Sequence, residues 1–502
     1  MDLSTAVSAT VSTLRRRPAD LLPFYFLGTA VPVISRVGLF VALAGVYLHF
    51  ELTGRLADAR ETLATIDLTP PDTQDPEAIE RWADGLAPAL EPLASPTALV
   101  LVAAGTLLAV LLAILAYAAV SAGQMSAVVA RLRSDRGLPE GIAGVRHRWL
   151  TFLGLYVAEF LLWVSVIVFA SVAIALAFLA NPFLGAAVAL VALLFGLLAV
   201  LVVRILFAFA PAAIVVDDVG VAGSLRGAGG FVRSNPADAA AYLVVAVGAV
   251  IGISSAASAL AFLGGGAIVA LVSAVLVAPA LDLLKTVLYG DYRGTVDPVA
   301  PVERRYRDQL LDGIRRGWRE MGGFVRRTPG YHAFTILVGV GFGVAGWLAV
   351  EPLIGAVTTS IDARLADHIA PTAALNFFGN NWSVAIATSL SGVALVIPAV
   401  SSIAFNGLAL GATAALEENL LALVAFVIPH GIFEIPALFI AGALGIHLGV
   451  VSWRAFRGRV GREAFADALE TAFWVLIGVG ILLAVAGFIE GFISPYYWRP
   501  FI

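Results

Sequence analysis

Residues 405–449 decide the fold class of this chain, and they read FNGLALGATAALEENLLALVAFVIPHGIFEIPALFIAGALGIHLG. Most of these residues are apolar, as in chain segments that lie in the hydrocarbon core of a membrane. Asn406, His430 and Glu434 sit inside runs that are otherwise apolar. Polar groups in a membrane are costly unless they have partners, so they tend to face the interior of a helix bundle and to mark functional sites.

The composition of the whole chain is that of an integral membrane protein. Hydrophobic residues make up 60% and charged residues 13% of its 502 residues, and the mean hydropathy is +0.93. These values exclude an ordinary soluble globular protein. The chain contains no cysteine, which excludes disulfides, thiolate metal sites and cysteine catalysis.

The apolar runs predict an all-α, polytopic fold with about 11 transmembrane helices in two bundles, at ~20 residues a span. The spans are expected near residues 23–50, 97–124, 150–180, 184–210, 239–262, 264–288, 331–356, 382–404, 408–428, 431–451 and 472–493. Pro429, Gly431 and Pro436 predict broken or re-entrant helices in the second bundle. The sequence leaves open whether residues 405–428 cross the membrane fully or re-enter.

These spans predict three parts. Residues 1–290 form an N-terminal six-span membrane domain, in which residues 51–96 are an acidic extracytoplasmic loop. Residues 291–329 form a cytoplasmic linker that contains a basic amphipathic helix. Residues 330–502 form a second membrane domain of about five spans.

The distribution of arginine predicts the orientation of the chain in the cell membrane. Arginines gather at residues 15–17, 131–148, 304–327 and 454–462, and positively charged loops stay in the cytoplasm. We therefore expect a cytoplasmic N-terminus and an extracytoplasmic C-terminus. Arg15, Arg16 and Arg17 precede a long apolar run without a compact cleavage site, which predicts an uncleaved first span.

Residues 302–327 carry apolar side chains at steps of three and four, with arginines on the other faces. The apolar positions are Tyr306, Leu310, Ile314, Trp318, Met321 and Val325. This pattern predicts an amphipathic helix on the inner membrane surface. Its charge either serves only to orient the chain or forms a docking surface for anionic lipid or a cytosolic protein. We expect no nucleic-acid partner.

The C-terminal third, about residues 330–502, resembles the stage II sporulation protein M family. The segments that carry the resemblance are NFFGNNW, FNGLALG, PHGIFEIPALFIAGALGIHLG and AGFIEGFISP. Within them lie the polar residues Asn406, His430, Glu434 and Glu490, together with the supporting motif residues Asn376, Asn380, Gly407, Gly411, Pro429 and Gly431.

The resemblance implies a membrane subunit that acts with other envelope proteins. In sporulating bacteria, such proteins belong to a membrane complex that recruits peptidoglycan-degrading partners during engulfment. Relatives also occur in organisms that do not sporulate, so the resemblance implies envelope partners but not sporulation itself. Glycines that repeat at a spacing of four allow close helix packing, either within the subunit or in a homo-oligomer.

The N-terminal half is similar to six-span membrane domains that are associated with glycerophosphodiester phosphodiesterases. The similarity lies in RILFAFAPAAIVVDDVGVAGSLRGAGGFVRSNPADAAAYLV, residues 204–244. It implies an architecture of six spans. It does not imply phosphodiesterase chemistry, which belongs to a separate soluble domain.

His430 and Glu434 are four residues apart, so they share a face of a continuous helix, and Glu490 can approach them from the last span. Three interpretations remain open: a structural clamp, a proton- or ion-coupled transport site, and a metal or hydrolase centre. The third lacks the H-E-x-x-H pattern of zinc proteases and the G-x-S-x-G pattern of serine hydrolases. We therefore predict no catalytic, cofactor-binding or metal residues.

Charged residues also occur in the N-terminal spans. Arg36, Glu159 and Arg204 are candidates for buried ion pairs, with Glu159 as the shared acidic partner. The whole pattern predicts a non-enzymatic membrane component of cell-envelope biogenesis or remodelling that scaffolds partner proteins. The alternative is a transporter or lipid-handling permease that uses the polar site in the second bundle.

Overall fold

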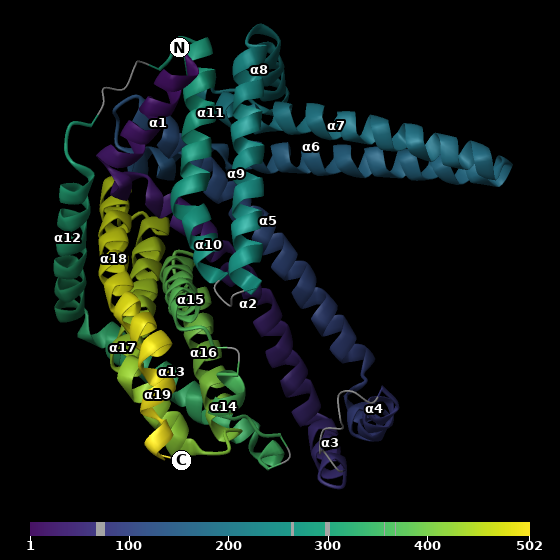
Figure 1. Ribbon diagram of the computed structural model, residues 1–502, viewed down its shortest axis with the longest axis vertical. Helices are drawn as coiled ribbons and strands as arrows, with labels where there is room; N and C mark the ends of the chain where they lie inside the picture. Colours follow the sequence, from purple (N-terminus) through teal and green to yellow (C-terminus); the bar gives the residue numbers. More distant parts are fainter. Residues whose placement is uncertain (67–75, 263–265, 297–301, 356, 367, 502) are drawn as a thin grey trace. The chain divides into compact units, whose positions relative to one another are not determined.

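The computed structural model describes residues 1–66, 76–262, 266–296, 302–355, 357–366 and 368–501. Throughout these residues the fold is α-helical (Figure 1), with two isolated β-bridges and no β-strand. Part of the predicted acidic loop, residues 67–75, lies outside the described residues.

In chain order, the α-helices are α1 (Leu3–Arg16), α2 (Leu22–Leu52), α3 (Arg55–Leu63), α4 (Pro76–Leu90), α5 (Pro96–Leu132), α6 (Gly137–Ala180), α7 (Pro182–Val216), α8 (Val221–Ser234), α9 (Pro236–Phe262), α10 (Ala267–Val272), α11 (Ala278–Tyr292), α12 (Tyr306–Arg327), α13 (Pro329–Ala349), α14 (Ile361–Arg364), α15 (Ala370–Ser391), α16 (Ile397–Ala415), α17 (Leu420–Phe456), α18 (Arg462–Phe492) and α19 (Ser494–Tyr497). A π-helical turn, Ser273–Val277, joins α10 to α11.

Within the described residues, 10 helical segments are long and apolar enough to cross a membrane. They are α2, α5, α6, α7, α9, the continuous segment from α10 to α11, α13, α16, α17 and α18. Helix α15 has 22 residues but is not among them, and it carries the polar stretch NFFGNNW. The prediction of an all-α polytopic membrane protein is confirmed.

The predicted break at Pro429–Gly431 is wrong, because α17 is one helix of 37 residues that contains both Pro429 and Pro436. Each proline removes one backbone donor without ending the helix. The chain is interrupted elsewhere, between α15 and α16 and between α16 and α17. Residues 405–428 are therefore divided between two helices, and the separate spans expected at 408–428 and 431–451 do not exist.

The contacts divide the chain into two compact units. Unit 1 consists of residues 1–28, 115–255 and 272–305, and unit 2 of residues 29–114, 256–271 and 306–502. Helices α2, α5 and α9 therefore contribute to both units. The predicted division of the chain at residues 290 and 330 stays a prediction.

Unit 1 contains a long hairpin of α6 and α7, and side-chain caps mark where both helices begin. The Asn181 side chain accepts hydrogen bonds from the backbone N–H groups of Phe183 and Leu184, and Pro182 occupies the first turn of α7. At the start of α6, the Asp20 carboxylate accepts from the N–H groups of Gly137 and Leu138 at 2.8 and 3.0 Å.

Unit 2 contains a bundle of α13, α15, α16, α17 and α18, which lie side by side (Figure 1). Glycines allow α13 and α16 to approach closely. A Cβ atom added at Gly407 or Gly411 would collide with the backbone oxygen of Gly339 or Gly343. The glycine repeats that the sequence left open thus serve helix packing within the chain.

Helix α12 packs lengthwise against α18 (Figure 1), with Gly317 against the backbone of Gly478. A guanidinium on the same face, that of Arg316, lies 3.0 Å from Glu470 and over the ring of Trp474. Helix α18 is a candidate membrane span, and the expectation that α12 lies on the inner membrane surface stays a prediction. Of the six apolar positions that the sequence pattern marked, five are exposed and Met321 is buried, so the face that packs on α18 is not the predicted one.

Candidate functional site

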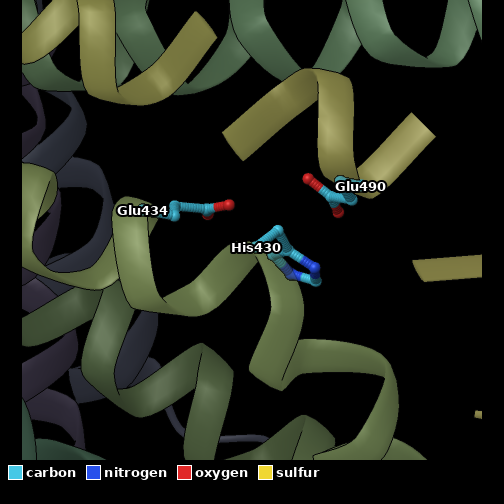
Figure 2. A group of neighbouring side chains, drawn as sticks. All are labelled: His430, Glu434 and Glu490. Atoms are coloured by element: carbon cyan, nitrogen blue, oxygen red, sulfur yellow. The ribbon is translucent and has the colours of Figure 1, made fainter. Parts of the chain in front are cut away.

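The structure brings together three ionisable side chains in unit 2, namely His430, Glu434 and Glu490. His430 and Glu434 lie one turn apart on α17, and Glu490 lies near the end of α18. A ring nitrogen of His430 and one carboxylate oxygen of each glutamate all lie within 4.8 Å of one another. Figure 2 shows the two carboxyl groups pointing toward each other across the space above the imidazole.

The imidazole of His430 is held firmly in place. The residue is 6% exposed, and its Nδ1 atom lies 2.9 Å from the Ser494 hydroxyl at the start of α19. The ring of Phe426, one turn earlier on α17, packs edge-on against it at a centroid distance of 5.5 Å. These contacts fix the orientation of the ring relative to the two glutamates.

The two glutamates are only partly satisfied. Among the described residues, no hydrogen-bond partner is present for the buried Oε2 atoms of Glu434 and Glu490. A buried polar atom without a partner costs about 1–3 kcal/mol, and more when it carries charge. Two such oxygens within one cluster indicate that a further group, such as a proton, a water molecule or a cation, completes the site.

A cavity of about 370 Å³ opens onto the cluster. Its polar lining includes Asn380, Asn406, His430, Glu434, Glu490 and Arg364. The Arg364 guanidinium lies 3.0 Å from Glu417 and is thus already paired. The cavity therefore gives a small polar ligand access to the carboxylates, and the arginine in its wall already has a partner.

The other predicted polar residues surround the cluster without joining it. Asn406 lines the cavity while its amide donates to the backbone oxygen of Ser402 at 2.8 Å. Asn380 lines the same cavity and donates to the Asn381 side chain at 3.2 Å. Asn376 accepts from the backbone N–H of Ala267 at 3.2 Å and so caps α10.

The remaining motif residues are parts of α16 and α17. Gly407 and Gly411 pack against α13, as described above. Pro429 lies inside α17, and Gly431 lines the cavity one residue after His430.

Ser494 and Arg364 are residues of the site that the sequence did not predict. Ser494 lies in the stretch AGFIEGFISP, and its position four residues after Glu490 was a usable signal. Arg364 comes from the short helix α14 and had no such signal, because its proximity to Glu417 depends on how α14 packs against α17.

The predicted ion pairs have different outcomes. Arg204 lies 3.1 Å from Glu159, which joins α7 to α6. The pair is not buried within the protein, because the Arg204 side chain is 66% exposed. Arg36 instead lines a second cavity of about 640 Å³, whose wall also contains Asn380 and Asn406.

Unit 1 contains a charged cluster that the sequence did not predict. The Asp217 carboxylate, just after α7, accepts from the Arg293 guanidinium at 2.7 and 2.6 Å and from the Tyr289 hydroxyl at 2.6 Å. Burial acts to raise the pKa of Asp217, but the hydrogen bonds from Arg293 and Tyr289 outweigh it and lower the pKa. The paired aspartate also holds the pKa of Arg293 well above its usual range.

The fold and the site define the class of this protein: it is a multi-pass α-helical membrane protein with a histidine–glutamate cluster in a cavity of its second helix bundle. Residues 333–495 match the family model of stage II sporulation protein M, which confirms the resemblance of the C-terminal third. The match begins in α13, ends in α19 and contains every residue of the cluster. No curated protein and no solved structure matches the chain. The similarity of the N-terminal half to phosphodiesterase-associated domains stays a prediction.

Proposed function

We propose that this protein is a non-enzymatic membrane component of cell-envelope biogenesis or remodelling, and that it scaffolds partner proteins. The match of residues 333–495 to stage II sporulation protein M supports this proposal. The sequence contains neither the H-E-x-x-H nor the G-x-S-x-G pattern, which favours a role in assembly over a role in catalysis.

The observation that carries the proposal is the way α12 is joined to the matched region. Gly317, Met321 and Phe324 are buried, and the helix packs along α18. Three arginines on the same helix, Arg307, Arg319 and Arg326, are exposed. A basic surface fixed rigidly to a membrane bundle supports docking of an acidic segment of a partner protein.

The test is cross-linking in native membranes, followed by identification of the proteins that co-purify with the full chain. We expect envelope proteins to be captured by the native chain and lost when Arg307, Arg319 and Arg326 are all changed to Glu. The matched control changes the same three residues to Lys, which keeps the charge and should keep most partners. Identical partners in the Glu and Lys variants would contradict docking through α12.

A second candidate function rests on a separate observation, the cavity that opens onto His430, Glu434 and Glu490. Ionisable groups at membrane depth relay protons or bind ions in transporters, so the cavity favours a permease. Purified protein in vesicles distinguishes the two functions. Proton-coupled uptake or lipid movement by the chain alone would overturn the scaffold and establish the permease.

The proposed orientation places residues 51–96 outside the cell and residues 302–327 in the cytoplasm. The chain has no native cysteine, so single cysteines report the topology without background. We predict that Asp84→Cys reacts with an impermeant maleimide in intact cells, whereas Arg315→Cys reacts only after the membrane is opened. The reverse pattern would show that the arginine distribution does not orient this chain.

A further inference from the structure

We propose that His430, Glu434 and Glu490 bind one divalent transition-metal ion, with Zn²⁺ as the cation that suits the three donors best. This site goes beyond the proposed scaffold, because neither partner docking nor the surface of α12 depends on it.

The donor set selects the class of ion. An imidazole suits zinc, iron, nickel and copper, whereas Mg²⁺ and Ca²⁺ prefer oxygen donors only. The chain has no cysteine to offer a soft thiolate donor. One nitrogen and two carboxylate oxygens form a set of three protein ligands, which is the number that zinc sites with an open position use.

The geometry is close to that of a bound ion. Zinc bonds to nitrogen and oxygen are about 2.0–2.2 Å long, so tetrahedral donors lie about 3.3–3.6 Å apart. The three donor atoms here lie within 4.8 Å of one another. Side-chain rotations that move the carboxylate oxygens of the two glutamates by about 1 Å bring these oxygens to bonding distance from a shared ion. Figure 2 shows both carboxyl groups already directed into the shared space.

The surroundings supply the rest of a metal site. Ser494 holds one ring nitrogen of His430, and such a second contact fixes the orientation of a ligating imidazole. The cavity of about 370 Å³ leaves room for water or a substrate at a fourth position. A cation there would also give the unpartnered Oε2 atoms of both glutamates a partner.

A divalent cation would balance the charge of the cluster in its ionised form. Two carboxylates carry −2, and a neutral imidazole does not compensate them, which is costly at membrane depth. Arg364 is the charged neighbour in the cavity wall, and it lies 3.0 Å from Glu417. A divalent ion makes the cluster neutral, whereas a clamp formed by these three residues alone leaves both carboxylate oxygens unpaired.

The test uses the tag-free full chain in detergent, stripped with EDTA and titrated with Zn²⁺ against a fluorescent zinc indicator. We expect one tight zinc site per chain. Glu434→Gln and Glu490→Gln each keep the shape of the side chain but remove a ligand charge, and each should weaken binding by about 100-fold or more.

Two matched controls come from the same helices. Glu470→Gln changes the glutamate of α18 that pairs with Arg316, and His447→Asn changes a histidine of α17 that packs against Phe324. Neither residue lines the cavity, so both variants should bind zinc within about threefold of the native chain.

A second measurement, zinc X-ray absorption on the native chain, remains informative if the glutamine variants do not fold. One imidazole and a shell of oxygen ligands would support the site. Absence of stoichiometric zinc, or equal zinc binding by the folded double variant Glu434→Gln/Glu490→Gln, would overturn it and show adventitious zinc only. Either of these two results would identify Glu434 and Glu490 as a carboxyl pair that shares a proton. Neither result would test the docking of partner proteins.

Discussion

In unit 1, Asp217 accepts three hydrogen bonds from Arg293 and Tyr289. In unit 2, Glu434 and Glu490 each keep a buried oxygen without a partner among the described residues. Both clusters contain acidic groups near the ends or middle of long apolar helices, and the second opens onto a cavity. The hydrogen bonds that the carboxylates accept therefore distinguish a structural cluster from one that is available for a ligand.

The largest loss of stability is expected when Asp217 is changed. Asp217→Ala leaves the Arg293 guanidinium and the Tyr289 hydroxyl without their acceptor, so we expect a loss of about 2–3 kcal/mol of stability. The loss is measured by thermal unfolding of the purified chain in detergent. Asp218→Asn is the matched control, because it keeps a residue type that tolerates the left-handed backbone there and removes only an exposed pair with Arg148, which should contribute less than about 1 kcal/mol. Equal losses at the two positions would remove the contrast between the clusters.

A smaller loss is expected at the contact that orients His430. Ser494→Ala removes the hydroxyl at 2.9 Å from Nδ1 and should cost about 1 kcal/mol. Ser452→Ala, on the same helix as His430, removes a buried hydroxyl without a partner among the described residues and should be neutral or slightly stabilising. Melting temperatures of the two variants provide the comparison, and a neutral Ser494→Ala would show that the ring is held by packing alone.

A substitution that raises stability, instead of lowering it, is expected within the cavity. In the metal-free protein, Glu434→Gln replaces an unpaired carboxylate by a neutral group of the same shape, and we expect it to raise stability by up to about 1 kcal/mol. The measurement is thermal unfolding in EDTA, with Glu470→Gln as the control that breaks an existing ion pair. Marked destabilisation by Glu434→Gln and by Glu434→Ala would instead identify the cluster as a structural clamp.

The smallest effect concerns how the stability of the protein depends on acidic pH. Because the folded-state pKa of Asp217 is lowered, its contribution to stability is present above the unfolded pKa of about 4 and is lost as the pH falls through the folded value. The melting temperature of the native chain should therefore fall at acidic pH, and it should fall less steeply for Asp217→Asn. The difference between the two pH profiles isolates this carboxylate, and parallel profiles would assign acid lability to other groups.

Composition and short-range pattern by themselves determined the class of this protein. The apolar runs predicted a polytopic α-helical membrane protein, since helix formation in lipid requires only local hydrogen bonds. The spacing of His430 and Glu434 placed both on one face of a helix for the same reason. The motif segments from NFFGNNW to AGFIEGFISP predicted the resemblance of the C-terminal third to stage II sporulation protein M, which the match over residues 333–495 confirms.

The tertiary structure decided what the local pattern could not. Proline and glycine predicted a break at residues 429–431, but α17 is continuous there and packs against α13, α15, α16 and α18. Glu490 reaches the cluster from another helix, and Ser494 and Arg364 join its surroundings only because α18, α19 and α14 pack against α17. Hydrophobic periodicity reports which face of a helix is apolar, whereas the neighbours of each face depend on contacts between residues far apart in the chain.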